Sequence, residues 1–220
     1  GHFLMARHYG MAASPPYFIP APTLIGTFGA FIRIRSPFFS RRDLFDVGIA
    51  GPVAGFVVAV PVLIGGLMLS IPVPTPLESG DFITFGEPLL YKMLKGILFH
   101  DLPAGTDILL HPVAFAGWIG MLVTSLNLLP VGQLDGGHIA YAIFGRRAAY
   151  LSYLLIAGLL AASFFYQGWL LWVVLLLILG LRHPPIPYMA PSLDPVRIRM
   201  AWLALVIFLL SFMPVPVNLG

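Results

Sequence analysis

The segment "NLLPVGQLDGGH", Asn127 to His138, combines several polar and ionisable side chains directly after a run of apolar residues. An ionisable side chain in a membrane-grade segment costs about 2.5 to 3.5 kcal/mol on insertion scales, so it first suggests a functional site. Pro130 interrupts helical hydrogen bonding and frees backbone groups, which membranes tolerate only where protein or a wet cavity surrounds them. We therefore expect this segment to line a cavity.

Asp135 and Asn127 each have a structural and a chemical interpretation. Asp135 could cap a following helix, with Gly136 permitting a tight entry, because aspartate accepts the free N–H groups of a first helical turn. It could equally be the carboxylate ligand of a metal ion. For Asn127 the alternatives are a hydrogen bond between membrane helices and donation to a developing oxyanion. Local sequence leaves both pairs of alternatives open.

His2 is a second candidate ligand. A single histidine near an apolar helix end is more often a hydrogen-bonded structural residue. Its surroundings, "GHFLMARHYG", look like the second half of a His-Glu-x-Gly-His helix, in which two histidines face one zinc ion and the glutamate is the general base. The first histidine and the glutamate of such a motif would precede Gly1, so we expect the chain to begin within this helix.

The composition places these residues in a membrane. Hydrophobic residues make up 59% of the 220 residues and charged residues 10%, against about 25% charged residues in soluble domains. The formal net charge of +3 therefore gives no reason to expect a nucleic-acid partner. The chain has no cysteine, so it forms no disulfides, and a metal ion must be held by His, Asp or Glu.

The sequence predicts an all-α polytopic membrane protein that forms one domain, residues 1–220. A hydrocarbon core about 30 Å thick needs about 20 apolar residues of helix. We expect five to six transmembrane helices, the first of which is the partial helix at residues 1–10. The later spans are expected at residues 46–70, 112–129, 148–165, 169–181 and 199–212.

Two long connections separate the predicted helices. Residues 15–45 begin Pro-rich and then alternate, with Ile32 and Ile34 beside arginines, which predicts a short membrane-associated β-hairpin or strand. Residues 71–111 carry apolar side chains at helical spacing between positions 89 and 97. This spacing predicts an amphipathic helix at the membrane interface.

The arginines orient the chain. All ten lie in or beside alternate connections, whereas residues 71–111 hold both lysines but five acidic residues. The positive-inside rule places the arginine-bearing side in the cytoplasm or its equivalent. His2 and Asp135 both lie near this face, so the two could meet although they are far apart in sequence. The arginines are Arg7, Arg33, Arg35, Arg41, Arg42, Arg146, Arg147, Arg182, Arg197 and Arg199.

Three blocks of the sequence together resemble the site-2 protease family of intramembrane zinc metalloproteases. They are the Gly-His-Phe of residues 1–3, the stretch "GTFGAFIRIRSPFFSRRDLFDVGIAGPVAGF" at residues 26–56, which is similar to the bacterial and plastid branch, and "NLLPVGQLDGGH". The blocks follow the family's order. The resemblance implies an endopeptidase that uses Zn²⁺ to cleave transmembrane segments of membrane-protein substrates.

The resemblance also implies a role for each matching residue. His2 matches the second zinc histidine and Asp135 the carboxylate zinc ligand. Asn127 matches a residue that binds the substrate carbonyl or stabilises the oxyanion. The first zinc histidine and the general-base glutamate are expected before Gly1, so the 220 residues by themselves are expected to be inactive.

Further residues are candidates for the surroundings of the zinc site or for a substrate channel. His138 follows the motif and could support the ligands, although a residue of the helix start is the simpler interpretation. Pro130 and Gly136 shape the same segment. Ile32 and Ile34 belong to residues 26–35, whose exposed edge could accept an unwound substrate as an added strand. A strand that merely covers the membrane face is the alternative.

Two other functions compete with proteolysis. One is a family member without catalysis that binds or chaperones membrane proteins. The other is a transporter component, which is disfavoured because no internal repeat is evident. We expect a multi-pass protein of the bacterial inner membrane, with the active site toward the cytoplasmic side. The expected partners are the lipid bilayer and transmembrane proteins, and the oligomeric state is left open.

Overall fold

The computed structural model describes residues 1–20, 27–74, 83–100, 102–103, 105–188 and 192–219. These residues form two compact units. Unit 1 comprises Gly1–Ala54 and Asn127–Ala204, and unit 2 comprises Gly55–Leu126 and Leu205–Gly220. Residues 21–26 and 75–82, parts of the two predicted connections, lie outside the described residues, as does Asp101.

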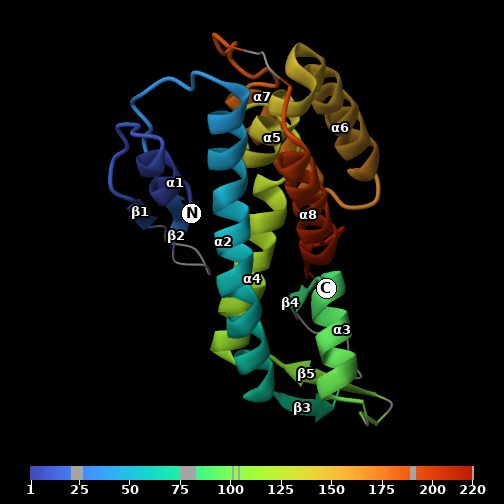
Figure 1. Ribbon diagram of the computed structural model, residues 1–220. Helices are drawn as coiled ribbons and strands as arrows, with labels where there is room; N and C mark the ends of the chain where they lie inside the picture. Colours follow the sequence, from blue (N-terminus) through green and yellow to red (C-terminus); the bar gives the residue numbers. More distant parts are fainter. Residues whose placement is uncertain (21–26, 75–82, 101, 104, 189–191, 220) are drawn as a thin grey trace. The chain divides into compact units, whose positions relative to one another are not determined.

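Unit 1 is a helical unit with one small sheet (Figure 1). The sheet pairs β1 with β2 in antiparallel fashion, Tyr17 opposite Phe31. The elements of unit 1 are α1 (His2–His8), β1 (Tyr17–Pro20), β2 (Thr27–Phe31), the first half of α2 (Arg41–Met68), α5 (Asp135–Phe144), η1 (Gly145–Arg147), α6 (Ala148–Ala162), α7 (Gly168–Leu179) and the first part of α8 (Pro195–Ser211).

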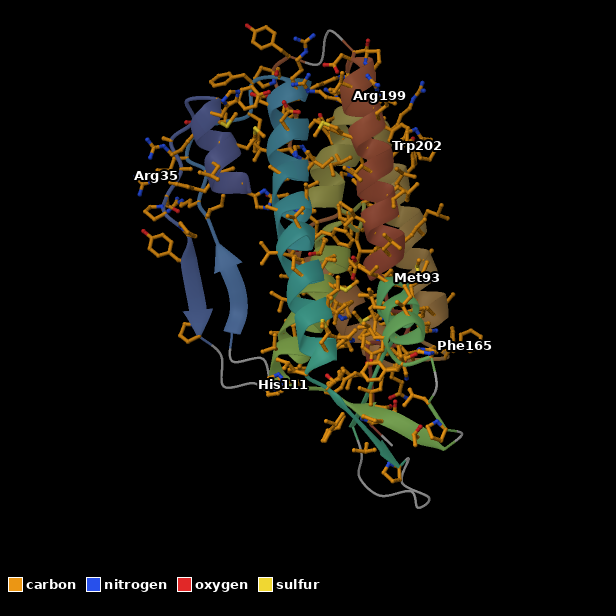
Figure 2. The ribbon with its side chains drawn as sticks, turned by 60° about the horizontal axis from the view of Figure 1, so that its bottom comes forward. Arg35, Met93, His111, Phe165, Arg199 and Trp202 are labelled. Atoms are coloured by element: carbon orange, nitrogen blue, oxygen red, sulfur yellow. The ribbon has the colours of Figure 1, made fainter. Side chains whose placement is uncertain are left out.

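Unit 2 contains the second half of α2 and most of α4, with two short antiparallel sheets. Its other elements are β3 (Ile71–Pro74), β4 (Ile83–Phe85), α3 (Leu89–Leu98), β5 (Thr106–Leu109), α4 (Pro112–Asn127) and β6 (Val217–Leu219). Strand β3 pairs with β5, and β4 pairs with β6. The helix predicted between positions 89 and 97 is present as α3, which buries Tyr91 and exposes Ile97 and Met93, the last of which is labelled in Figure 2.

Helices α2 and α4 approach closely in unit 2 because small residues face each other. A Cβ added at Gly117 would lie 2.6 Å from the backbone nitrogen of Leu63, and one at Gly66 would lie 2.0 Å from that of Ala114. Around this contact a core forms from Ala59, Leu63, Leu67, Tyr91, Ala114, Trp118, Met121 and Met213. The Trp118 indole N–H donates to the Gly86 carbonyl at 2.7 Å, which satisfies its polar end.

The predicted helical architecture is confirmed, but the count of five to six spans is not. Within the described part of the chain, two helical stretches are long and apolar enough to cross a membrane, Arg41–Met68 and Asp135–Ala162. The helices Pro112–Asn127 and Gly168–Leu179 are apolar but shorter.

The stretch from Asp135 to Ala162 is two helices and not one straight span. A straight helix would carry Ser152 about 25 Å from the start of α5, at 1.5 Å per residue. The Ser152 hydroxyl instead donates to the Pro130 carbonyl at 3.1 Å, just before α5 begins. The bend falls at η1, where Gly145 has a φ of +60°, and Figure 1 shows α5 and α6 as separate helices.

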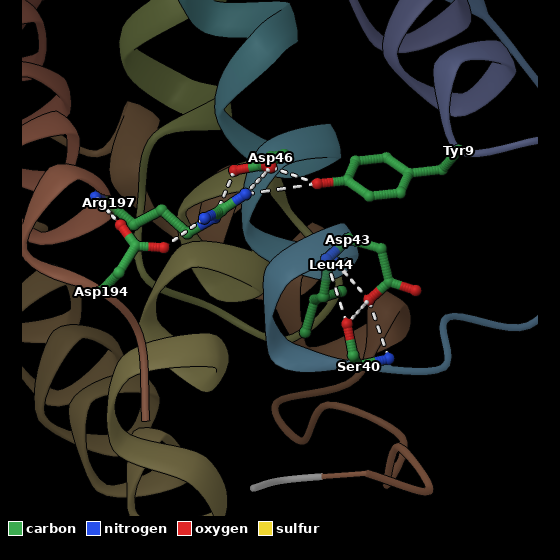
Figure 3. Close-up of polar contacts among 7 residues, drawn as sticks. All are labelled: Tyr9, Ser40, Asp43, Leu44, Asp46, Asp194 and Arg197. Atoms are coloured by element: carbon green, nitrogen blue, oxygen red, sulfur yellow. Dashed lines mark hydrogen bonds and ion pairs between the residues drawn. The ribbon is translucent and has the colours of Figure 1, made fainter. Parts of the chain in front are cut away.

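Helix α2 begins at Arg41, five residues before the predicted start of the span, because Ser40 and Asp43 form a reciprocal cap. The Asp43 carboxylate accepts the Ser40 N–H and Ser40 hydroxyl, both at 2.8 Å (Figure 3). It also accepts the Phe39 N–H at 2.9 Å. Capping of this kind satisfies free donors at a helix start. The Ser-x-x-Asp spacing is visible in the sequence and could have given the correct boundary.

The predicted hairpin is present, but Ile32 and Ile34 lie outside it because β2 ends at Phe31. Ile34 forms an isolated antiparallel bridge with Ala13. Its side chain packs against a cluster formed by Ala6, Met11 and Val47. The expected strand edge at residues 26–35 is therefore shorter than predicted, and Ile34 helps to join α1 to α2.

Candidate metal centre

The structure brings His2 and Asp135 together, as the arginine distribution predicted. The His2 Nε2 atom lies 3.2 Å from Asp135 Oδ2. The two residues come from α1 and from the first turn of α5, both in unit 1. The site is largely shielded, because the Asp135 side chain is 14% exposed.

The other nitrogen of His2 is held by the backbone of α2. His2 Nδ1 lies 2.8 Å from the Val47 carbonyl oxygen. A carbonyl can accept but not donate, so Nδ1 carries the hydrogen and a neutral His2 presents a lone pair on Nε2 toward Asp135. Histidines that bind metals commonly donate their second ring N–H in this way, which fixes the tautomer and the ring orientation.

The spacing of these two donors fits a zinc ion. Tetrahedral zinc holds nitrogen and oxygen ligands at about 2.0 to 2.2 Å, which places two ligand atoms about 3.4 Å apart. The observed separation of 3.2 Å is close to that value. Among the described residues, no third His, Cys, Asp or Glu joins the pair. The chain therefore offers two donors that suit zinc, at the positions where the sequence predicted ligands.

Two glycines of α2 make room for this arrangement, and sequence reasoning did not single them out. A Cβ added at Gly51 would lie 1.8 Å from His2 Nε2, and one at Gly48 would lie 2.9 Å from His138 Cβ. Helices α1 and α5 can approach α2 here because no side chain intervenes. The spacing of small residues in "GIAGPVAGF" could have indicated this close approach of helices.

The helix-cap interpretation of Asp135 is not observed. The N-cap of α5 is Leu134, and no side chain caps this helix. Asp135 instead occupies the first turn, where the helix dipole favours a negative charge. Gly136 is required at the next position because a Cβ there would lie 2.0 Å from the Leu128 carbonyl oxygen.

Asn127 ends α4 and is half-buried. No described residue hydrogen-bonds to its side-chain amide. The predicted helix-to-helix hydrogen bond is therefore not seen in the described part of the chain, and the amide has donors available for another partner.

The turn at Pro130 is satisfied by a serine that sequence reasoning missed. Ser152 is buried in α6, donates to the Pro130 carbonyl at 3.1 Å and accepts the Gly132 N–H at 3.4 Å. A hollow of about 130 Å³ lies beside this turn, lined by Val131, Gln133, Leu134, Leu176, Leu179 and Gly180. The predicted cavity is thus small, and protein groups satisfy much of the exposed backbone.

His138 belongs to a hydrogen-bonded pair of histidines. Its Nδ1 atom lies 2.8 Å from His183 Nε2, and His183 Nδ1 lies 2.6 Å from the Pro184 carbonyl oxygen. The pKa of His183 is lowered overall, because the effect of burial outweighs the opposite effect of its hydrogen bond to Pro184. A neutral His183 donates through Nδ1 and accepts through Nε2, so His138 donates through Nδ1 and keeps a lone pair on Nε2. His183, which the sequence placed only at the exit of a span, therefore sets the tautomer of His138.

An ionic cluster ties three helices of unit 1 together near the metal-site residues (Figure 3). The Arg197 guanidinium of α8 forms a two-pronged contact with Asp46 of α2, with Nε 2.9 Å from Asp46 Oδ1. Arg197 also pairs with Asp194, and the Tyr9 hydroxyl donates to Asp46. Asp46 directly precedes Val47, whose carbonyl orients His2, so this cluster holds the supporting turn of α2.

Comparison with known proteins identifies relatives of the whole chain. The model of peptidase family M50 matches residues 1–164. The probable zinc metalloprotease EGY2, chloroplastic, of Arabidopsis thaliana is 35% identical over 98% of this chain and 39% of its own length. The protein of the same name from Oryza sativa subsp. japonica is 35% identical over 88% of this chain and 35% of its own length.

A second named group is similar over a shorter stretch. The probable zinc metalloprotease EGY1, chloroplastic, of Arabidopsis thaliana is 36% identical over 67% of this chain and 27% of its own length. This chain thus spans at most 39% of the length of these three curated relatives. No solved structure matches it. The predicted bacterial inner membrane gains no support, since these relatives are named as chloroplastic.

Proposed function

This chain belongs to peptidase family M50, and we propose that it supplies part of the active site of an intramembrane zinc endopeptidase. The observation that carries the proposal is the pair of His2 Nε2 and Asp135 Oδ2 at 3.2 Å, backed by the hydrogen bond from His2 to Val47. Zinc is the cofactor of this family, and the relatives are named zinc metalloproteases.

In the proposed site His2 and Asp135 hold the zinc ion through these two atoms. When bound, zinc polarises a peptide carbonyl and makes its water more acidic. Asp135 contributes one negative charge at the N-terminal turn of α5, and Val47 keeps the His2 lone pair aimed at the metal. Among the described residues no third ligand joins this pair, so the proposal assigns these two ligands alone.

Asn127 is the proposed donor to the oxyanion that develops on the scissile carbonyl. Its amide has no partner among the described residues, so it is free to donate when a substrate binds. A donor placed in advance at a developing charge stabilises the transition state more than the ground state. Pro130, Gly136 and His138 shape the wall of the site around it.

The proposed substrates are transmembrane segments of other membrane proteins, met within the bilayer. A substrate helix must unwind locally, because its peptide groups are already hydrogen-bonded and a cleavable bond must be extended. The β1–β2 hairpin contains two strands in the described part of the chain, so an unwound segment could add to its edge. Ile32 and Ile34 follow that edge, and Ile34 packs against the cluster of Ala6, Met11 and Val47.

The zinc content of purified full-length protein tests the ligand assignment. Wild-type protein should retain one zinc ion, and Asp135→Asn should lower zinc affinity at least tenfold. Loss of a residue that only supports a ligand already lowers metal affinity about 10- to 100-fold, and loss of the ligand itself should cost at least as much. Asp107→Asn is the matched control, since Asp107 lies in unit 2 and pairs with Lys95. Equal zinc content in wild type and Asp135→Asn would refute the assignment. Zinc retention without cleavage of a transmembrane substrate would instead favour the non-catalytic binding protein.

A further inference from the structure

A basic hollow lies at the start of α6. Neither His2 nor Asp135 lines it, but His183, the partner of His138, does. The volume of the hollow is about 490 Å³, and its lining comes from α5, η1, α6 and the connection after α7. The lining includes Arg146, Arg147 and Arg182 and the aromatic side chains of Tyr141, Tyr150 and Tyr153. All of these residues belong to unit 1. This size lies within the usual range for small-molecule sites.

In the part of the chain that the structure describes, no acidic residue neutralises the three arginines of this hollow. None of the described lining residues is Asp or Glu. No ion pair joins Arg146, Arg147 or Arg182 to a carboxylate among the described residues. Arg197 of the same unit, by contrast, is paired with two aspartates. Three guanidinium groups that share one hollow without a counter-charge favour an anionic ligand.

Tyr153 adds a donor to the arginines. Arg182 Nε donates to the Tyr153 hydroxyl oxygen at 2.7 Å, and its guanidinium carbon lies 6.0 Å from the centre of the Tyr153 ring. The Tyr153 hydroxyl accepts in this contact, so its own hydrogen is free to donate to a ligand. Guanidinium groups bind phosphate oxygens through paired N–H donors, which suits a phosphate better than a spherical anion.

The outer surface of α6 indicates what kind of molecule would bear such a phosphate group. Beyond the hollow, α6 exposes Leu154, and after its end Phe164 and Phe165 are 91% and 94% exposed. Figure 2 labels Phe165. Arginines at one end and bare apolar side chains farther along match the headgroup and acyl chains of a lipid. We propose that this hollow is a binding site for a phosphate group, occupied by the headgroup of an anionic membrane lipid.

Lipid binding by the purified full-length protein tests this site. The protein is placed in nanodiscs of phosphatidylcholine, with or without phosphatidylglycerol, and retained lipid is counted by native mass spectrometry. Each pocket arginine should contribute about fivefold to retention, so Arg146→Gln/Arg182→Gln should lose about 25-fold. Arg33→Gln/Arg35→Gln is the matched control, because both arginines are exposed and lie outside the hollow. Its retention of phosphatidylglycerol should equal that of wild type.

A second arm separates the lipid from free phosphate. Inorganic phosphate is titrated calorimetrically into protein held in phosphatidylcholine nanodiscs. Selective retention of phosphatidylglycerol without phosphate binding supports the lipid assignment, whereas tight binding of inorganic phosphate alone overturns it. If the double variant does not fold, Arg146→Lys and Arg146→Gln are compared at equal thermal stability, and the lysine variant should retain more lipid. Equal retention by the pocket and control variants would overturn the site.

Discussion

Both ring nitrogens of His2 have a defined task. Nδ1 donates to the backbone carbonyl of Val47, and Nε2 is thereby aimed at Asp135. The side chain can reach both partners because Gly51 leaves the facing surface of α2 bare. The geometry of the site therefore depends on the absence of a side chain at Gly51 as well as on the two ligands.

Gly51→Ala should therefore displace His2. The added methyl would begin 1.8 Å from His2 Nε2, so we expect at least tenfold weaker zinc binding and a loss of about 1 to 3 kcal/mol in unfolding free energy. Gly65→Ala is the control in the same helix, because a Cβ there meets nothing within 4 Å. It should be neutral or stabilising by up to about 1 kcal/mol. Chemical denaturation and zinc titration measure the two effects.

Asn127→Ala tests the oxyanion role. Loss of one such donor typically lowers kcat by about 100- to 1000-fold. We expect KM and zinc content to change little, because the donor acts on charge that develops in the transition state. Gln133→Ala removes an exposed amide six residues later and serves as the control. A kcat of Asn127→Ala equal to that of wild type would exclude the role.

Among the elements of unit 1, an arginine at the start of α8 links this helix to α2 and to the end of α1. Arg197 joins Asp46 and Asp194, and Tyr9 completes the cluster from the end of α1. The Asp46 side chain is 13% exposed, so its charge has little access to water. Without Arg197 this carboxylate would be left largely unpaired in the protein.

Arg197→Ala should lower the unfolding free energy by about 2 to 4 kcal/mol, because removing one partner of a shielded pair leaves an uncompensated charge. Arg199→Ala provides the control on the same helix. Arg199 is exposed, and its Nε contact with the Pro195 carbonyl is long, at 3.4 Å. Its loss should cost less than about 0.5 kcal/mol. Similar losses for both variants in denaturant titrations would show that the cluster does not hold α8.

Helix α3 gives unit 2 a sensitivity to alkaline conditions. Burial raises the pKa of Tyr91 from its ordinary value of 10.0 to about 12. Although burial lowers the pKa of Lys95, its hydrogen bonds and charge contacts with Glu87 and Asp107 raise it overall. As the pH rises, Tyr91 and Lys95 therefore each lose a proton at a lower pH in the unfolded chain than in the folded protein.

We expect the unfolding free energy to fall as the pH rises from about 10 to about 12. For Tyr91 the folded state keeps its proton through this range while the unfolded state loses it, so alkali favours unfolding. The contribution of Lys95 has the same sign, since it is complete below the unfolded pKa and is lost as pH rises through the folded pKa. Tyr91→Phe should flatten the decline when unfolding is measured across this range. An unchanged slope would contradict the assignment to Tyr91.

For the whole molecule, patterns of composition and charge predicted more than local spacing did. The segregation of arginines placed His2 and Asp135 on one face, and the two do meet. Apolar spacing predicted α3, and a hairpin was expected within residues 15–45, although the alternating residues Ile32 to Arg35 follow β2 and are not part of it. The helix could be predicted from a periodicity within a short segment, and the meeting of His2 and Asp135 from a charge bias along the whole chain.

Other features depend on contacts between distant residues. Neither the Arg197–Asp46 contact nor the His138–His183 pair has a local signature, since both join residues from separate segments. The count of five to six spans is not confirmed because apolar content does not fix helix length, and Pro112–Asn127 and Gly168–Leu179 are shorter than the roughly 20 residues that a bilayer requires. Helix ends were missed where the cap, as at Ser40 and Asp43, lies in polar residues before the apolar run.

The hydrogen bond from His2 to Val47 is made to the main chain. Val47→Ala would leave the acceptor in place, so a side-chain scan would pass over the group that orients His2. The side chain of Val47 itself packs in a cluster with Ala6 and Met11. The most direct support of the proposed ligand therefore depends on the path of the α2 backbone, and not on the identity of any one side chain.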